Sequence, residues 1–436
     1  MTVLLGLCAA VGLPAVGLPG AAPAAADGAW PGSYAFTPGA RAVTGTEGTA
    51  DAVLLDPHHT YRSSLPRGGR LYYRLRLAAQ DTAYVPVTAV PPAGTAVSAT
   101  DGIRVSLRDA DGTSCSYASA RFGAGLSPRP VTALGQRETG KALCQGGGTY
   151  YVLVERLDAE GSGAAASAGP WGLEIAPATE PGLARTGTTT PPQNWDSATP
   201  EPLGGRPRDR SGGTGFAGAR PLGPGVWRTA LAPGETRFYK VPLDWGRRLY
   251  ASAELGSAPG HGYAGGALNL SLYNPVRGSV EDASLGYTGA AKSAALAPLP
   301  PVEYANRYAV QAAVTSVRFA GEYYLVLHLS TQLSRTFGHG PFEVTLRVWV
   351  DGQAHAGPGY AGSAVPEDVF TITGRDRAAV LTGGTGDGGD GGDDRVMRLV
   401  AVGGIGSGTA LLLFLGGWTV TSRWPRARSR GRARAR

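Results

Sequence analysis

The sequence predicts an all-β protein with two tandem jelly-roll-like antiparallel β-sandwiches and one C-terminal transmembrane helix. Three observations carry this prediction: a composition rich in turn formers, an internal repeat of strand-like phrases, and an uncharged stretch near the C-terminus. Glycine (67) and proline (33) make up nearly a quarter of the 436 residues, and charged residues only 17%. This balance favours short elements joined by many turns, and the length suits two modules of ordinary size.

The repeat begins with "GRLYYRLRL" at 69–77 and its near-copy "ETRFYKVPL" at 235–243. The match runs without a gap through 61–84 and 227–250, always 166 positions apart. Three later pairs of phrases follow in the same order: "GIRVSLRDADG" (102–112) with "ALNLSLYNPVRG" (267–278), "GGTYYVLVERL" (147–157) with "AGEYYLVLHLS" (320–330), and "GPWGLEIAP" (169–177) with "GPFEVTLRVWV" (340–350). We therefore expect a tandem duplication of roughly 130 residues per unit.

Each repeated phrase has the character of a strand. "YYVLVERL" and "YYLVLHLS" are runs rich in aromatic and β-branched residues after a glycine. "LRDADG" and "YNPVRG" are turn sequences, which close hairpins. Short strands separated by such turns predict an antiparallel sandwich in each copy.

The order of these phrases resembles the bacterial pre-peptidase C-terminal domain, a jelly-roll-like β-sandwich attached to secreted enzymes and surface proteins. The stretch "FYKVPLDWGRRLYASAEL" (238–255) is similar to the membrane-proximal ectodomain of actinobacterial surface proteins, some of which carry a von Willebrand factor A domain. That domain is absent here, since its D-x-S-x-S metal motif is approached only by "DGTSC" at 111–115. The resemblance implies a fold and a surface setting, and it supplies no catalytic residues.

The two ends of the chain predict a membrane topology. Residues 1–26 read as a secretory signal peptide cut after Ala26, although no Lys or Arg precedes the apolar run. Residues 399–420 are 22 uncharged residues, long enough to cross a bilayer as a helix. Arginines follow this stretch and aspartates precede it, so the positive-inside rule places the tail in the cytoplasm. We expect a single-pass cell-membrane protein with its N-terminal ectodomain outside.

These signals divide the chain into eight parts. The expected ranges are a signal peptide (1–26), an N-terminal extension (27–47), β-sandwich 1 (48–178), a Pro/Gly/Thr-rich linker (179–211), β-sandwich 2 (212–352), a stalk (353–395), the transmembrane helix (396–422) and an Arg-rich cytoplasmic tail (423–436). The linker composition predicts an extended, mobile connection, and hence relative motion of the two modules.

Charge argues against nucleic acid as a partner. Seven of the 40 basic residues lie in the tail, and the remaining 33 are balanced by 33 acidic residues. Within the membrane span, Gly404 and Gly408 have the spacing of a helix-packing motif, so a homodimer through the helix is one interpretation. The other interpretation is that these two glycines only reflect the glycine-rich composition of the chain.

Cys115 and Cys144 are the only cysteines left once the signal peptide is removed. In an exported protein such a pair is expected to form a disulfide, and the alternative is two unpaired thiols. A closed loop of about 30 residues stabilises by roughly 3 to 4 kcal/mol in the loop-entropy treatment.

No cofactor, metal site or catalytic motif is expected. Asp109 and Asp111 have the spacing that starts a calcium loop, but the further ligands are missing and a plain turn is favoured. The six histidines never form H-E-x-x-H, and neither a G-x-S-x-G elbow nor a phosphate-binding loop occurs.

Four aromatic residues are candidates for binding: Tyr73, Tyr239, Trp171 and Trp245. Adjacent strand positions face opposite sides of a sheet, so where two aromatic residues are adjacent on a strand, one of them faces outward. Outward rings could form platforms for glycan or protein, whereas the simpler interpretation is packing in the core and on the sheet.

The sequence therefore predicts a non-enzymatic cell-surface protein whose two modules bind a partner protein of the envelope or a cell-wall polymer. One alternative is a scaffold or sensor subunit of a membrane complex, assembled through the helix. An unrecognised extracytoplasmic hydrolase is the other.

Overall fold

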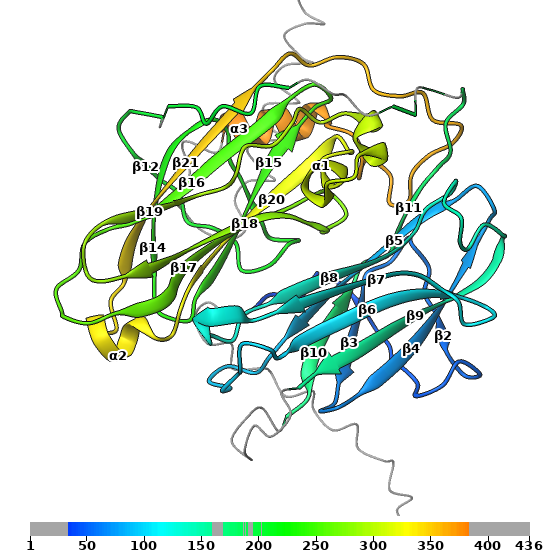
Figure 1. Cartoon of the computed structure of the whole chain (residues 1–436), viewed down its shortest axis with the longest axis horizontal. Coiled ribbons are helices and arrows are strands. Elements are labelled where there is room, and N and C mark those ends of the chain that lie inside the picture. The colour runs from blue at the N-terminus through cyan, green and yellow to red at the C-terminus, as the bar shows by residue number, and fades with distance from the viewer. Residues whose placement is uncertain are drawn as a thin grey trace, which may run out of the picture. The chain divides into compact units, whose positions relative to one another are not determined.

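Two β-sandwiches with the same strand order make up the described part of the chain (Figure 1). The structure is a computed structural model that describes residues 34–158, 169–185, 187, 189–190, 195–201 and 203–382. These described residues all belong to one compact unit. We call residues 41–180 module 1 and residues 208–351 module 2.

Module 1 contains two facing sheets. The first has the order β1 (Arg41–Ala42), β3 (Tyr61–Leu65), β10 (Trp171–Ile175), β5 (Thr82–Val90) and β11 (Ala178–Glu180), and β8 (Val131–Arg137) also pairs with β5. The second has the order β2 (Val53–Leu54), β4 (Arg70–Leu77), β9 (Gly148–Leu157), β6 (Gly102–Asp109) and β7 (Ser114–Arg121).

Module 2 repeats this plan. Its first sheet has the order β12 (Arg208–Asp209), β14 (Gly225–Leu231), β21 (Phe342–Asp351), β16 (Arg248–Leu255) and β19 (Lys292–Ala295). Its second has the order β13 (Arg220–Pro221), β15 (Thr236–Leu243), β20 (Gly321–Leu329), β17 (Ala264–Tyr273) and β18 (Ser279–Tyr287). The short helices are η1 (Gly123–Gly125), η2 (Tyr304–Tyr308), α1 (Ala312–Ser316), α2 (Leu333–Phe337) and α3 (Gly374–Thr382).

The duplication extends to strand register. Tyr73 pairs with Val152 between β4 and β9, and Tyr239 pairs with Leu325 between β15 and β20. The predicted antiparallel pairing holds for the long strands. Each of the four sheets also starts with a two-residue parallel edge strand, which the repeated phrases do not signal.

The cores follow from alternation along the strands. In β4 the side chains of Leu71, Tyr73, Leu75 and Leu77 are buried, and the residues between them are less so. Such a two-residue period places one row of side chains between the two sheets of a sandwich.

The predicted disulfide is confirmed. Cys115 on β7 is bonded to Cys144 in the loop before β9, with a Cα–Cα distance of 5.6 Å. In module 2 the corresponding connection, between β19 and β20, instead carries η2 and α1. The two copies therefore differ at this loop.

Three predicted boundaries shift in the structure. Part of the expected N-terminal extension belongs to module 1, because β1 begins at Arg41. Module 2 begins earlier than expected, with β12 at Arg208. The segment after Gly352, expected as a stalk, pairs its main chain with residues 179–184 of module 1 and the adjoining linker as far as residue 365. We call residues 352–373 the C-terminal segment.

Among the described residues, no helix is long and apolar enough to cross a membrane. The predicted signal peptide (1–26), the predicted membrane helix (396–422) with Gly404 and Gly408, and the predicted tail (423–436) lie outside the residues that the structure describes.

Candidate binding site

The aromatic residues predicted to form exposed platforms lie inside the protein. Tyr73, Tyr239 and Trp171 are at most 1% exposed and Trp245 is 8% exposed. Tyr73 Oη donates to Ser63 Oγ at 2.8 Å, and burial raises the pKa of Tyr73 to about 12. For the first three the platform interpretation is wrong and the simpler interpretation of packing in the core holds, because their strands turn these rings into the cores. Trp245 lines a cavity, described below.

Tyr239 is buried together with its neighbour Phe238. Both faces of β15 are covered, because the aromatic residues Tyr34 and Phe216 pack against Phe238 with ring centroids 5.7 and 5.0 Å away. Tyr239 Oη donates to the Arg210 carbonyl at 3.1 Å. No surface is left there for a ligand.

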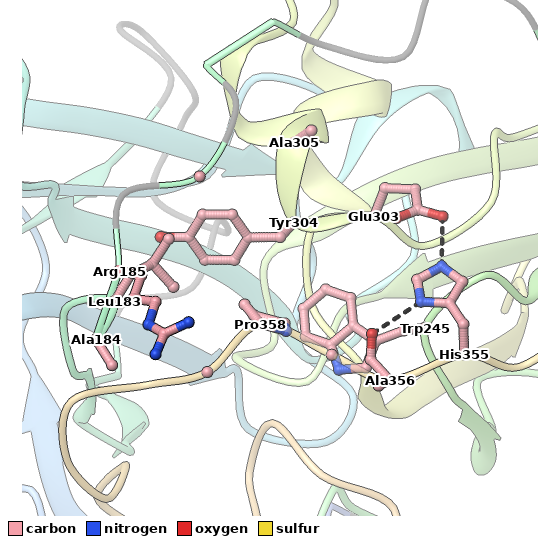
Figure 2. A pocket seen from close by; sticks show the side chains of 13 residues that line it. Leu183, Ala184, Arg185, Trp245, Glu303, Tyr304, Ala305, His355, Ala356 and Pro358 are labelled. Carbon is pink, nitrogen blue, oxygen red and sulfur yellow. Dashed lines mark hydrogen bonds and ion pairs between the residues drawn. The ribbon is translucent and has the colours of Figure 1, made fainter.

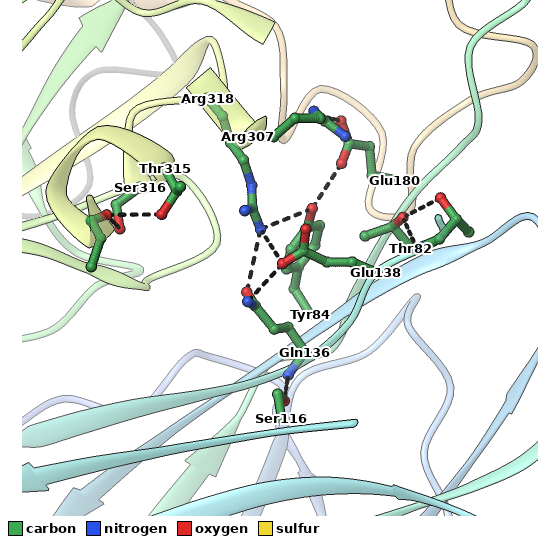
Figure 3. A network of polar contacts seen from close by, with 12 residues as sticks. Thr82, Tyr84, Ser116, Gln136, Glu138, Glu180, Arg307, Thr315, Ser316 and Arg318 are labelled. Atoms are coloured by element: carbon green, nitrogen blue, oxygen red, sulfur yellow. Dashed lines mark hydrogen bonds and ion pairs between the residues drawn. The ribbon is translucent and has the colours of Figure 1, made fainter. Parts of the chain in front are cut away.

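The two modules share a buried polar interface, shown in part in Figure 3. At its centre Glu180 of β11 is 1% exposed and accepts hydrogen bonds from three side chains. Tyr84 Oη donates at 2.8 Å, Arg307 Nη2 of module 2 at 2.7 Å, and Tyr360 Oη of the C-terminal segment at 2.8 Å. Burial opposes the charge on Arg307, but the Glu180 carboxylate outweighs it and raises the pKa of Arg307.

A second arginine crosses the interface beside the first. Arg318 of module 2 is 5% exposed and lies 3.3 Å from Gln136 Oε1 and 3.4 Å from both Glu138 Oε1 and Tyr84 Oη. Burial raises the pKa of Tyr84 well above its ordinary value, so the phenol stays neutral and donates to Glu180.

Glu174 of β10 forms another contact between the modules. It is fully buried, accepts from the Tyr34 hydroxyl at 3.1 Å and the Thr37 amide at 2.7 Å, and pairs with Arg277 of module 2 at 2.5 Å. A buried carboxylate needs such partners, since an unpaired buried charge is strongly destabilising.

His328 on β20 makes a neutral contact across the same interface. Its Nε2 lies 2.9 Å from Ser127 Oγ of module 1, and its Nδ1 lies 2.9 Å from Thr236 Oγ1. Burial and the nearby positive charge of Arg129 lower the pKa of His328 to about 3. These buried polar contacts hold the two modules together. They argue against the relative motion that the linker composition predicts.

A cavity of about 630 Å³ opens where the linker, the β15–β16 turn, η2 and the C-terminal segment meet (Figure 2). The residues whose side chains matter most are Arg185, Trp245, Glu303, Tyr304 and His355. Pro358, Leu183 and Ala184 complete the apolar part of the wall.

Two glycines allow the wall to close around Trp245. Gly246 has φ +79°, a conformation that favours glycine, and a Cβ there would lie 2.2 Å from the Gln353 carbonyl oxygen. At Gly357 a Cβ would lie 2.1 Å from Trp245 Nε1. The C-terminal segment can therefore pass directly over the β15–β16 turn and the indole ring.

The polar side of the cavity holds a glutamate paired with a histidine, and one unpaired arginine. His355 Nε2 lies 2.8 Å from Glu303 Oε1, and its Nδ1 lies 2.9 Å from the Ala356 carbonyl oxygen. The Ala356 carbonyl and the Glu303 carboxylate raise the pKa of His355. Arg185 is exposed and has no hydrogen-bond or ion-pair partner among the described residues.

The cavity wall is continuous with the module interface. Arg307 Cζ lies 3.4 Å from the centre of the Tyr304 ring, and Tyr360 packs edge-on against the same ring at 6.3 Å between centroids. Both Arg307 and Tyr360 donate to Glu180. The Tyr304 ring is thus fixed in place by groups that the interface itself orders.

The aspartates at 109 and 111 form a turn. Asp109 Oδ1 accepts from the amides of Asp111 at 3.1 Å and Thr113 at 2.8 Å. In the part of the chain that the structure describes, no group of three or more His, Cys, Asp or Glu side chains is placed to hold a metal ion.

Sequence analysis missed Arg185, Glu303, Tyr304 and His355. They lie in a linker, a 3-10 helix and a segment read as a stalk, and none of them belongs to a repeated phrase. The one available signal was Trp245, in the turn between two repeated strands.

No protein-family model matches the chain, and no curated protein matches it. The resemblance to the pre-peptidase C-terminal domain thus has no family match behind it. Among solved structures, the N-terminal CBM22-1-CBM22-2 tandem domain of Paenibacillus barcinonensis Xyn10C is 13% identical with a TM-score of 0.18, over 70% of this chain and 95% of that one. The CUB1-EGF-CUB2 domain of human MASP-1/3 is 8% identical with a TM-score of 0.15, over 66% and 99%.

The extracellular domain of ANXUR2 from Arabidopsis thaliana is 9% identical with a TM-score of 0.16, over 67% of this chain and 85% of that one. Scores this low assign neither a fold family nor a function.

Proposed function

We propose that the chain is a non-enzymatic, single-pass cell-surface protein whose two extracytoplasmic modules act as one body and bind a partner protein or a cell-wall polymer. The observation that carries this proposal is the cavity between the linker, η2 and the C-terminal segment. Its size is within the range of ligand sites, and it combines apolar walls with a few polar groups.

The groups of the cavity favour binding over catalysis. Glu303 is paired with His355, and the remaining charged lining side chain, Arg185, is a cation that cannot act as a base at physiological pH. No second carboxylate or nucleophilic side chain lines the cavity among the described residues. General acid–base catalysis needs a positioned donor and acceptor pair next to a reacting group, and this set offers none beyond the one ion pair.

The membrane setting of the proposal rests on the sequence. The uncharged residues 399–420 and the arginines after them support a single span with the modules outside the cell. The scaffold alternative, which depends on Gly404 and Gly408, concerns residues outside the described part of the chain.

The test is capture by the full-length protein in detergent, with purified cell-wall sacculi and with solubilised envelope proteins as separate baits. The variants Tyr304→Ala and Arg185→Ala are expected to weaken capture at least about tenfold, a loss of about 1.4 kcal/mol. Tyr117→Ala is the control, since Tyr117 is 75% exposed and does not line the cavity. Unchanged capture by both cavity variants would exclude this cavity as the binding site.

A further inference from the structure

We propose that the cavity takes a saccharide that carries a carboxylate, with its ring packed on the aromatic wall and its carboxylate bound by Arg185. This inference rests on the proposed function and names the ligand class for the same site. The aromatic wall, the charge balance and the pairing of the surrounding main chain each contribute to it.

The aromatic wall suits a pyranose ring. Tyr304 is half-buried and lines the cavity, and Trp245, which is 8% exposed and partly covered by the C-terminal segment, supports the wall beside it. The C–H bonds on one side of a sugar ring carry partial positive charge, and aromatic faces carry partial negative charge, so the two pack favourably. Arg307 and Tyr360 hold the Tyr304 ring from behind, so little conformational entropy is lost on binding.

The charges favour an anion. Glu303, the acidic side chain in the lining, is already paired with His355 at 2.8 Å. Arg185 has no partner among the described residues, and Figure 2 shows its guanidinium beside Pro358 at the cavity. A guanidinium binds a carboxylate through two parallel hydrogen bonds, so an acidic ligand gains an interaction that a neutral one lacks.

The main chain argues against an extended peptide. Peptides commonly bind by adding a strand to an unpaired edge. Here the edges around the cavity are already paired: Ala184 N donates to Gly359 O at 2.9 Å, and Ala361 N to Gly182 O at 2.8 Å. On the opposite side His355 N donates to Trp245 O at 3.1 Å. A sugar ring that contacts only side chains of the protein fits this lining better than a peptide.

The volume of about 630 Å³ limits the ligand to a short saccharide segment. Two sources share the required chemistry. One is an N-acetylmuramic acid unit, which has a lactyl carboxylate, and the other is a uronic acid, which has its carboxylate on the ring.

The experiment uses the full-length protein in detergent and isothermal titration calorimetry with three ligands. These are the N-acetylglucosamine–N-acetylmuramic acid disaccharide, a tetrasaccharide of alternating N-acetylglucosamine and glucuronic acid, and neutral diacetylchitobiose. We expect at least one acidic saccharide to bind about tenfold or more tightly than the neutral one, since a charge-assisted bidentate pair contributes at least about 1.4 kcal/mol. The preferred acidic ligand identifies the source.

Two variants separate charge from ring packing. Arg185→Ala should remove the preference for acid, and Arg185→Lys should keep part of it at a lower affinity. Tyr304→Ala should weaken neutral and acidic saccharides alike. Equal affinity for acidic and neutral saccharides, or a preference that survives Arg185→Ala, would overturn the inference.

The outcomes also separate this inference from the proposed function. If no saccharide binds but an envelope protein is captured in a manner that depends on Tyr304, the saccharide inference fails and the cavity remains the binding site. If the cavity variants change neither saccharide binding nor capture of an envelope component, both the saccharide inference and the proposed binding site fail.

Discussion

Arg307 of module 2 donates a hydrogen bond to Glu180 of module 1 at 2.7 Å, and the Glu180 side chain is only 1% exposed. A charge pair buried this deeply costs desolvation, and it is stabilising only while both partners are present. Separating the modules would leave each charge without its partner. The pair therefore ties the positions of the two modules to each other.

Breaking this pair should destabilise the ectodomain strongly. Glu180→Gln leaves Arg307 without a counter-charge, and removal of one partner of a buried pair typically costs about 3 to 5 kcal/mol. Urea unfolding followed by tryptophan fluorescence would measure the loss. We also expect weaker ligand binding, because Glu180 holds Arg307 and Tyr360 against the Tyr304 ring.

The control for this variant is Asp209→Asn. Asp209 pairs with Arg228 at 2.6 Å on the surface of module 2, where solvent screens the interaction. The unfolding midpoint should barely move. If both variants shifted the midpoint equally, burial at the interface would not be the source of the stability.

Tyr73→Ala should lower the free energy of unfolding, and not only the affinity for a ligand. The ring is fully buried in the core of module 1, and removal of a large buried aromatic side chain typically costs about 3 to 5 kcal/mol. Tyr73→Phe keeps the ring and loses only the bond to Ser63, about 1 kcal/mol. Denaturant unfolding of both variants checks this, and a normally stable Tyr73→Ala protein that fails to bind ligand would restore the exposed-platform interpretation.

Reduction of the Cys115–Cys144 bond should lower the free energy of unfolding by about 3 to 4 kcal/mol, from the entropy of the loop it closes. The measurement is the thermal midpoint with and without reductant. The double variant Cys115→Ser, Cys144→Ser should match the reduced protein and no longer respond to reductant. A wild-type midpoint that ignores reductant would contradict this.

His328 should make stability depend on pH in the acidic range. Its pKa is lowered to about 3 in the folded protein, against an ordinary value of 6.5. Between these two pH values the unfolded chain binds a proton that the folded chain does not. The free energy of unfolding therefore decreases as the pH is lowered, by up to about 1.4 kcal/mol per pH unit. Above about pH 6.5 the stabilising contribution of the neutral His328 is fully present, and below about pH 3 it does not change further.

The groups that face His328 are the Arg129 guanidinium, the hydroxyls of Ser127 and Thr236, and the main chain of Glu235. His328→Gln removes the titration and keeps hydrogen-bonding capacity. The difference between the wild-type and variant unfolding curves from pH 7 to 4 isolates the effect. Parallel curves would show that His328 does not titrate on unfolding.

Strands, their repetition and the disulfide could be predicted because they leave local signals. A two-residue period, a constant offset of 166 and a single pair of cysteines are visible without knowledge of any contact. The facing direction of Tyr73 was also visible, since Leu71, Leu75 and Leu77 share its parity and arginines occupy 70, 74 and 76.

The interface and the cavity could not be predicted in this way. Glu174, Glu180 and Arg318 belong to residue types that usually lie on the surface, yet they are buried, and each has a charged or polar partner in the other module. The C-terminal segment pairs through its main chain, which side-chain composition does not report. Phe238, the neighbour of Tyr239, is covered by Tyr34, which lies outside module 2 and far away in the sequence.

If the two modules form one body, the distance between them is fixed, and this distance can be measured. Spin labels attached through ketone-bearing amino acids at Tyr117 in module 1 and Tyr263 in module 2, both largely exposed, would report that distance by pulsed dipolar spectroscopy of the full-length protein. We expect one narrow distance distribution that broadens in Glu180→Gln. A broad distribution in the wild-type protein would show that the modules move independently, as the linker composition alone suggests.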